Sequence, residues 1–145
     1  AAAPARAEAA PSSPAWRAPL RVSIVDDNPD ALRTMAFLLQ AHGHAVTTHA
    51  DAESALAAVD AGSADVYLLD IGLPGMDGHA LARCLRSDPR TMRAALVALS
   101  GYGQAADLDA SFAAGFDAHL VKPVDIERLL GVLHDLDAVR GATAP

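Results

Sequence analysis

The segment that decides the fold runs from Val66 to Gly78 and reads VYLLDIGLPGMDG. Its first four residues are apolar on both faces, which predicts a buried strand over Val66–Leu69. Asp70 follows directly, and glycine, proline and aspartate then recur at short intervals, which is typical of a loop. Asp70 is therefore expected at the point where a buried strand ends and a loop begins.

Polar residues also follow strand-length apolar runs elsewhere in the chain. These places are Val25-Asp26-Asp27, Leu99-Ser100-Gly101 and His119-Leu120-Val121-Lys122-Pro123. The carboxyl ends of parallel strands meet at one edge of an open α/β sheet, and that edge is where such sheets hold ligands. Crowded carboxylates repel one another, and a hard divalent cation bound through oxygen relieves the repulsion. The sequence therefore predicts a magnesium-assisted phosphate site at this edge.

Strand patterns alternate with helix patterns along the rest of the chain. Strands are expected over residues 20–25, 45–48, 66–69, 94–99 and 118–121. Helices are expected from 29 to before 43, from 52 to 59, from after 78 to before 89, from 105 to 114 and from 125 to 139. Short connections between alternating strands and helices imply right-handed crossovers. The fold class is therefore α/β, with a parallel sheet covered by helices on both faces.

The length and composition fit one folded domain. The chain has 145 residues, which is too short for two domains of ordinary size. Residues 1–19 are dominated by alanine, proline and serine, which predicts a flexible linker. The domain is expected over residues 20–139, with residues 140–145 as a tail. The net charge of −7 disfavours nucleic-acid binding, because phosphate contacts need a basic face.

Features that indicate a compartment all favour the cytoplasm. No apolar run approaches the roughly 20 residues that span a bilayer, so no membrane contact by this segment is expected. The start of the chain also lacks the basic-then-apolar layout of a secretion signal. Cys84, the only cysteine, cannot form an internal disulfide, and its apolar-periodic setting predicts a buried structural thiol.

Taken together, the strand-end motifs carry a family resemblance. Their order and spacing resemble the receiver domain of two-component response regulators, and the resemblance covers about residues 20–139. The motifs concerned are Asp26-Asp27, Asp70 with Pro74 and Asp77-Gly78, Ser100-Gly101, and Lys122-Pro123. The resemblance implies a doubly wound, five-stranded parallel sheet of order 2-1-3-4-5, a flavodoxin-like (CheY-like) three-layer sandwich.

The resemblance also implies roles for the acidic residues. Asp70 would accept a phosphoryl group from the phosphohistidine of a histidine kinase or of a phosphotransfer domain. Asp27 would bind Mg²⁺ directly and Asp26 mainly through water, with Asp70 and the backbone carbonyl of Gly72 as further ligands. Mn²⁺ is an alternative cation at the same site.

The remaining site residues lie after the fourth and fifth strands. By resemblance, Lys122 approaches the phosphoryl oxygens, and a cis peptide bond joins it to Pro123. The Ser100 hydroxyl moves to hydrogen-bond the phosphoryl group after transfer. His119 occupies the family's switch position, where rotation between inward and outward orientations signals phosphorylation. The other five histidines show no paired spacing that indicates a zinc site.

Each of these residues also has an ordinary structural interpretation. Asp70 alone could cap the following loop, and Asp26 with Asp27 could cap the first helix. Asp77-Gly78 is interpreted as loop-and-cap chemistry, not as catalysis. The conjunction of all the motifs, and not any one of them, favours the phosphoacceptor role for Asp70.

Functions of other classes remain alternatives. A magnesium phosphohydrolase that forms an aspartyl phosphate usually has an acidic residue two positions after the nucleophile, where this chain has Gly72. A nucleotide or flavin module would need a glycine-rich phosphate loop after the first strand, and none is present. A degenerate receiver used only for protein contact is disfavoured, because every matched site position is filled. The chain's own chemistry would be phosphotransfer to its aspartate and autodephosphorylation.

Two kinds of full-length protein are considered for this domain. The stretch from Phe116 to Asp125 looks like that of C-terminal receivers in hybrid sensor histidine kinases, which often follow a linker. Such a domain would form the cytoplasmic end of a membrane-bound kinase. A stand-alone, single-domain response regulator is the second alternative.

Overall fold

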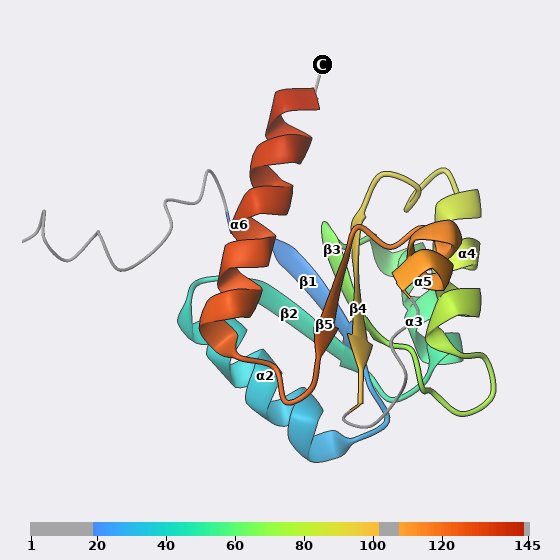
Figure 1. Ribbon diagram of the computed structural model, residues 1–145, viewed down its shortest axis with the longest axis horizontal. Helices are drawn as coiled ribbons and strands as arrows, with labels where there is room; N and C mark the ends of the chain where they lie inside the picture. The colour runs from blue at the N-terminus through green and yellow to red at the C-terminus, as the bar shows by residue number, and fades with distance from the viewer. Residues whose placement is uncertain (1–18, 102–107, 144–145) are drawn as a thin grey trace, which may run out of the picture.

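One parallel sheet forms the centre of the molecule (Figure 1). The computed structural model describes residues 19–101 and 108–143, and the facts below concern those residues. The strands are β1 (Arg21–Val25), β2 (Ala45–His49), β3 (Val66–Asp70), β4 (Ala95–Ser100) and β5 (Ala118–Val121). They lie in the order β2-β1-β3-β4-β5, and all neighbouring pairs are parallel. The predicted fold class and strand order are confirmed, with strand bounds within one residue of those expected.

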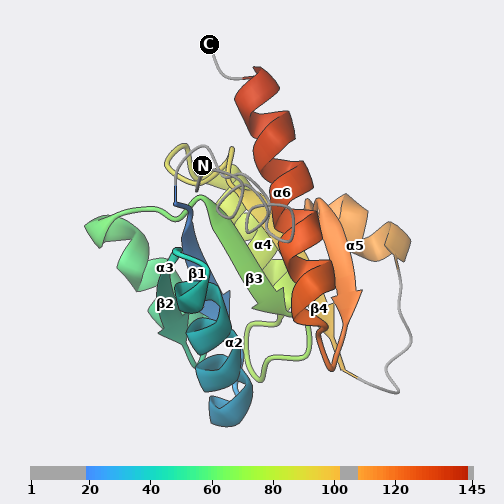
Figure 2. The ribbon, with the colours of Figure 1, turned by 90° about the vertical axis from the view of Figure 1, so that its left-hand side faces the viewer.

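Helices cover both faces of this sheet (Figure 2). They are α2 (Pro29–Ala41), α3 (Ala52–Ala58), the short 3₁₀ helix η2 (Val59–Ala61), α4 (Gly78–Ser87), α5 (Leu108–Ala114) and α6 (Ile126–Thr143). α2 and α6 pack on one face, and α3, α4 and α5 pack on the other. The protein is therefore a three-layer sandwich.

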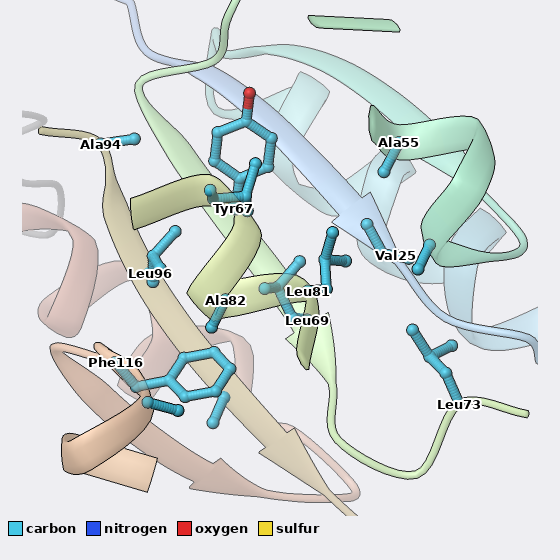
Figure 3. Close-up of a cluster of buried hydrophobic side chains, with 14 of the residues drawn as sticks. Val25, Ala55, Tyr67, Leu69, Leu73, Leu81, Ala82, Ala94, Leu96 and Phe116 are labelled. Atoms are coloured by element: carbon cyan, nitrogen blue, oxygen red, sulfur yellow. The ribbon is translucent and has the colours of Figure 1, made fainter. Parts of the chain in front are cut away.

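The alternation of side chains along β3 builds two hydrophobic cores. Val66 and Leu68 point to the α2 and α6 face, whereas Tyr67 and Leu69 point to the opposite face. Figure 3 shows the second core, where Tyr67 and Leu69 lie among side chains of α3 and α4 and near Phe116. Because both faces are buried, β3 is apolar at every position before Asp70. Packing in both cores holds β3 in place, and this fixes the position of Asp70 at its end.

Several expected boundaries differ from the observed ones. The last helix continues to Thr143, so residues 140–143 extend a helix that was expected to end at Val139. In the linker predicted over residues 1–19, residues 1–18 lie outside the described part, as do residues 105–107 of the fourth expected helix. Cys84 on α4 is partly exposed, so the prediction of a buried thiol was wrong. Within the described residues, no helix combines the length and apolarity needed to cross a bilayer.

Candidate functional site

Three carboxylates meet at the carboxyl edge of the sheet. Asp26 and Asp27 follow β1, Asp70 ends β3, and the two strands are paired with Val25 opposite Leu69. One oxygen from each carboxylate lies within 4.8 Å of the others. Asp26 is 0% exposed and Asp70 is 6% exposed, whereas Asp27 is open to solvent. The site thus combines two buried acids with one that incoming solutes can reach.

The first helix does not use these acids as its cap. The Asn28 side chain caps α2 by accepting hydrogen bonds from the backbone amides of Asp30, at 2.9 Å, and Ala31, at 3.2 Å. Asp26 Oδ1 accepts from the Asn28 amide at 2.9 Å, which fixes the turn that enters the helix. The capping interpretation of Asp26 and Asp27 was therefore wrong. Because Asn28 supplies the cap, the Asp27 carboxylate and the second oxygen of Asp26 are left for another role.

The loop after β3 holds Asp70 in place. Asp70 Oδ1 accepts a hydrogen bond from the Gly72 amide at 2.8 Å, so Asp70 does cap the following loop through this oxygen. Asp77 caps α4 by accepting from the Ala80 amide at 2.9 Å. A Cβ on Gly78 would lie 2.6 Å from the backbone oxygen of Asp70. Gly78 is thus required for close approach of α4 to Asp70, a role that the turn-and-cap interpretation missed.

Lys122 joins the acids from the end of β5. Its Nζ lies 2.6 Å from Asp26 Oδ2 and 3.1 Å from Asp70 Oδ2. Burial alone would lower the pKa of Lys122, but the two carboxylates outweigh it and the pKa is raised above its ordinary value. The Lys122 amide donates to the Ser100 carbonyl at 2.8 Å, and the peptide bond from Lys122 to Pro123 is cis. The ammonium is therefore charged at neutral pH and held against both buried acids.

The donor set of this edge suits a small, hard cation. Three carboxylates and one ammonium leave two negative charges uncompensated among the four groups. Asp26 Oδ2 is buried, and no donor among the described residues makes a well-aligned hydrogen bond to it, although the Lys122 ammonium is close. Carboxylate oxygens are the ligands that Mg²⁺ prefers in proteins. The residues present thus fit a divalent ion in charge and in chemistry.

Ser100 and His119 lie side by side at the ends of β4 and β5. Ser100 is 0% exposed, and its Oγ is 2.9 Å from His119 Nε2. The other ring nitrogen, Nδ1, is 3.3 Å from Ser111 Oγ on α5, and that hydroxyl is 3.2 Å from His79 Nε2 on α4. Burial, and to a smaller extent His79, lowers the pKa of His119 below its ordinary value. The His119 ring therefore points inward and is favoured in its neutral form.

Sequence reasoning did not find Ser111 or His79. The residues are 32 positions apart in the chain and belong to different helices, so no spacing rule connects them. Only the packing of α4 against α5 brings the imidazole to the hydroxyl, while the His79 ring also meets Phe116 edge-on at 6.0 Å. A polar residue on the inner side of α5 was the one available signal.

The family model of the response regulator receiver domain matches residues 22–134. Protein RcaC of Microchaete diplosiphon is 37% identical over 123 residues, which are 84% of this chain and 19% of that protein. A gliding motility regulatory protein of Myxococcus xanthus is 40% identical over 103 residues, which are 71% of this chain and 13% of that protein. The chain thus spans less than a fifth of the length of these two relatives.

Solved structures of receiver domains have the same fold. A CheY-like receiver domain protein from Methanospirillum hungatei has a TM-score of 0.78 at 26% identity, covering 88% of this chain and 100% of that one. The receiver domain of a sensor histidine kinase from Pseudomonas aeruginosa was solved with a magnesium ion in its active-site cleft. It has a TM-score of 0.75 at 26% identity, with coverage of 83% and 99%. The triad of Asp26, Asp27 and Asp70 is typical of receiver magnesium sites. The chain belongs to the response regulator receiver domain family.

Proposed function

We propose that this chain is a phosphoacceptor module of a two-component phosphorelay, with Asp70 as the acceptor. The observation that carries the proposal is the contact of Asp70 Oδ2 with Lys122 Nζ at 3.1 Å, beside two further carboxylates. A carboxylate oxygen of Asp70 attacks phosphorus, the bond from phosphorus to the donor imidazole nitrogen breaks, and the imidazole keeps the electron pair. The product is an acyl phosphate, and attack by water on phosphorus later returns the carboxylate and inorganic phosphate.

The residues around Asp70 have separate tasks in this transfer. Asp26, Asp27, Asp70 and the carbonyl of Gly72 would hold Mg²⁺, or Mn²⁺, which neutralises charge on the phosphoryl oxygens. The Lys122 ammonium already contacts an Asp70 oxygen. After transfer it would contact the phosphoryl oxygens and stabilise their negative charge as a point charge. The Ser100 hydroxyl, at the end of the neighbouring strand, would donate to a phosphoryl oxygen once transfer is complete.

A groove beside the site gives the phosphodonor a route of approach. It has a volume of about 480 Å³ and is lined mainly by apolar side chains of α2 and of the start of α6, including Leu38 and Ile126. Gly101 and Lys122, which belong to the site, form part of the same lining. We propose that the histidine-bearing domain of a kinase or phosphotransfer protein docks here, so that its phosphohistidine reaches Asp70.

The context of the domain is also a proposal. The stretch from Phe116 to Asp125 and the likeness to a sensor-kinase receiver support a C-terminal receiver of a hybrid histidine kinase at the cytoplasmic side of a membrane. A stand-alone response regulator is the alternative. The reading frame upstream of Ala1 decides between them, because only a hybrid kinase has histidine-kinase domains encoded there.

Labelling by a small phosphodonor tests the function directly. We expect acetyl phosphate with Mg²⁺ to add one base-labile phosphoryl group, because the acceptor, the acidic edge and the lysine occur together. Intact-mass measurement counts the added groups, and EDTA should abolish the gain. A protein that gains no phosphoryl group under any divalent ion would contradict the proposal.

Asp27→Asn separates metal binding from structural roles of the acidic edge. Asp27 is exposed, so relief of like-charge repulsion should raise the free energy of unfolding without metal by less than about 1 kcal/mol. The variant should also lose most of the magnesium-induced rise in Tm and label slowly. Melts with and without Mg²⁺ check this, with Asp30→Asn as a control for the magnesium response, because Asp30 is an exposed acid in the first turn of α2 that pairs with Arg33 and lies outside the triad. A variant that keeps the full magnesium response would show that Asp27 is not a ligand.

A further inference from the structure

A line of hydrogen bonds runs from the site to the first turn of α4. It joins Ser100, His119, Ser111 and His79, with separations of 2.9, 3.3 and 3.2 Å between consecutive polar atoms. The four residues come from β4, β5, α5 and α4, which lie together on one side of the molecule (Figure 1). Ser100 and Ser111 are buried, at 0% and 1% exposure, while both histidines are partly exposed.

When both rings are neutral and Ser111 donates its hydroxyl proton to one of the two rings, the protons of this line can be arranged in two directions. A neutral imidazole has one donor and one acceptor nitrogen, and a hydroxyl has one proton to donate. In the first direction Ser100 donates to His119, His119 donates to Ser111, and Ser111 donates to His79. In the second direction His79 Nε2 donates to Ser111, Ser111 donates to His119 Nδ1, and His119 Nε2 donates to Ser100.

Only the second direction leaves the Ser100 proton available for a phosphoryl oxygen on Asp70. In the first direction that proton is already donated to His119 Nε2. We propose that His79, acting through Ser111, is a positioning residue that sets the tautomer of His119 and thereby the donor capacity of Ser100. This inference rests on the proposed function, because it assigns the Ser100 hydroxyl to the phosphoryl group.

Because these hydrogen bonds are coupled, a change at Ser100 also affects His79, just as a change at His79 affects Ser100. A phosphoryl group that accepts a hydrogen bond from the Ser100 hydroxyl favours the His119 tautomer with its hydrogen on Nε2. Ser111 then donates to His119 Nδ1, which favours the His79 tautomer with its hydrogen on Nε2. The state of Asp70 is therefore transmitted to the first turn of α4 without rotation of His119 to the outside. His79 is partly exposed, so a partner on the α4 and α5 side can sense the change.

Ring-nitrogen NMR of the full chain with ¹⁵N-labelled histidine tests the proposal. Spectra are recorded at about pH 8, above the ordinary pKa of histidine. Beryllium fluoride with Mg²⁺ serves as the phosphoryl mimic. On its addition we expect the hydrogen of both His119 and His79 to settle on Nε2. In Ser111→Ala the His79 response should disappear, and in Ser111→Thr, which keeps the hydroxyl, it should persist. A His79 response that is equal in the alanine variant would overturn the inference.

A second comparison does not depend on the phosphoryl mimic. His79→Phe keeps a ring beside Phe116 but has no nitrogen. When this substitution is made in the parent chain, the tautomer of His119 should therefore shift. The same change should have no effect in the Ser111→Ala background, and His79→Gln should restore the parent tautomer. An unchanged His119 tautomer in His79→Phe overturns the inference. If acetyl phosphate labels the chain while His79 stays silent, only this inference fails. If labelling itself fails, the proposed function fails with it.

Discussion

Asp70→Asn should remove all phosphoryl incorporation from acetyl phosphate while leaving the domain folded. The asparagine amide oxygen is too weak a nucleophile to form an acyl phosphate, so the loss should be complete within detection by intact mass. The side chain can still accept the hydrogen bond that the Gly72 amide now gives to Oδ1 at 2.8 Å. The fold around β3 should therefore survive the change.

Asp77→Asn provides the matched control for this variant. Asp77 lies on the same loop and caps α4 through the Ala80 amide, a task that asparagine also performs. It lies outside the carboxylate triad, so labelling of this variant should equal that of the parent. Phosphoryl gain by Asp70→Asn at the parent level would place the acceptor elsewhere, with Asp26 and Asp27 as the next residues to replace.

The sequence was sufficient for the parts of the site that strand ends determine. Asp26, Asp70 and Ser100 each terminate an apolar run, and parallel pairing carries such ends to one edge of the sheet. The strand order came from the family resemblance, because alternation of strands and helices limits the topology without choosing one. Lys122 was predictable for the same reason as the acids, since it follows the run that forms β5.

Contacts between helices were not predictable in this way. The line from His119 to His79 depends on how α4 and α5 pack, and nothing in their separate patterns states which side chains will touch. The cap of α2 shows a different reason for failure. Asp27 and Asn28 are both good capping residues, and only the backbone geometry at Asn28 selects it over its neighbour. Local propensity left these alternatives equal, and tertiary structure decided between them.

Lys122→Met should cause the largest loss of stability among the site variants. The change removes the cation from two acids whose side chains are only 1% and 9% exposed, Asp26 and Asp70, while keeping most of the apolar stem. Removing one partner from a buried ion pair leaves an uncompensated charge, so we expect the free energy of unfolding without metal to fall by about 3 kcal/mol. Chemical denaturation of the parent and the variant measures this difference.

The dependence of this loss on pH and on Mg²⁺ identifies its cause. In the parent, the pKa of Lys122 is raised, so its contribution is fully present below the ordinary lysine value and is lost only as pH rises through the raised one. In the variant, two buried carboxylates lose their counter-charge, so its stability should fall as pH rises toward neutral, while the contribution of Lys122 in the parent stays constant there. Mg²⁺ should restore part of the loss at pH 8, because a divalent ion supplies the missing positive charge, and Lys122→Arg should stay near the parent. A loss that is independent of both pH and Mg²⁺ would mean that Lys122 stabilises the domain through packing of its stem, and not as the counter-charge of Asp26 and Asp70.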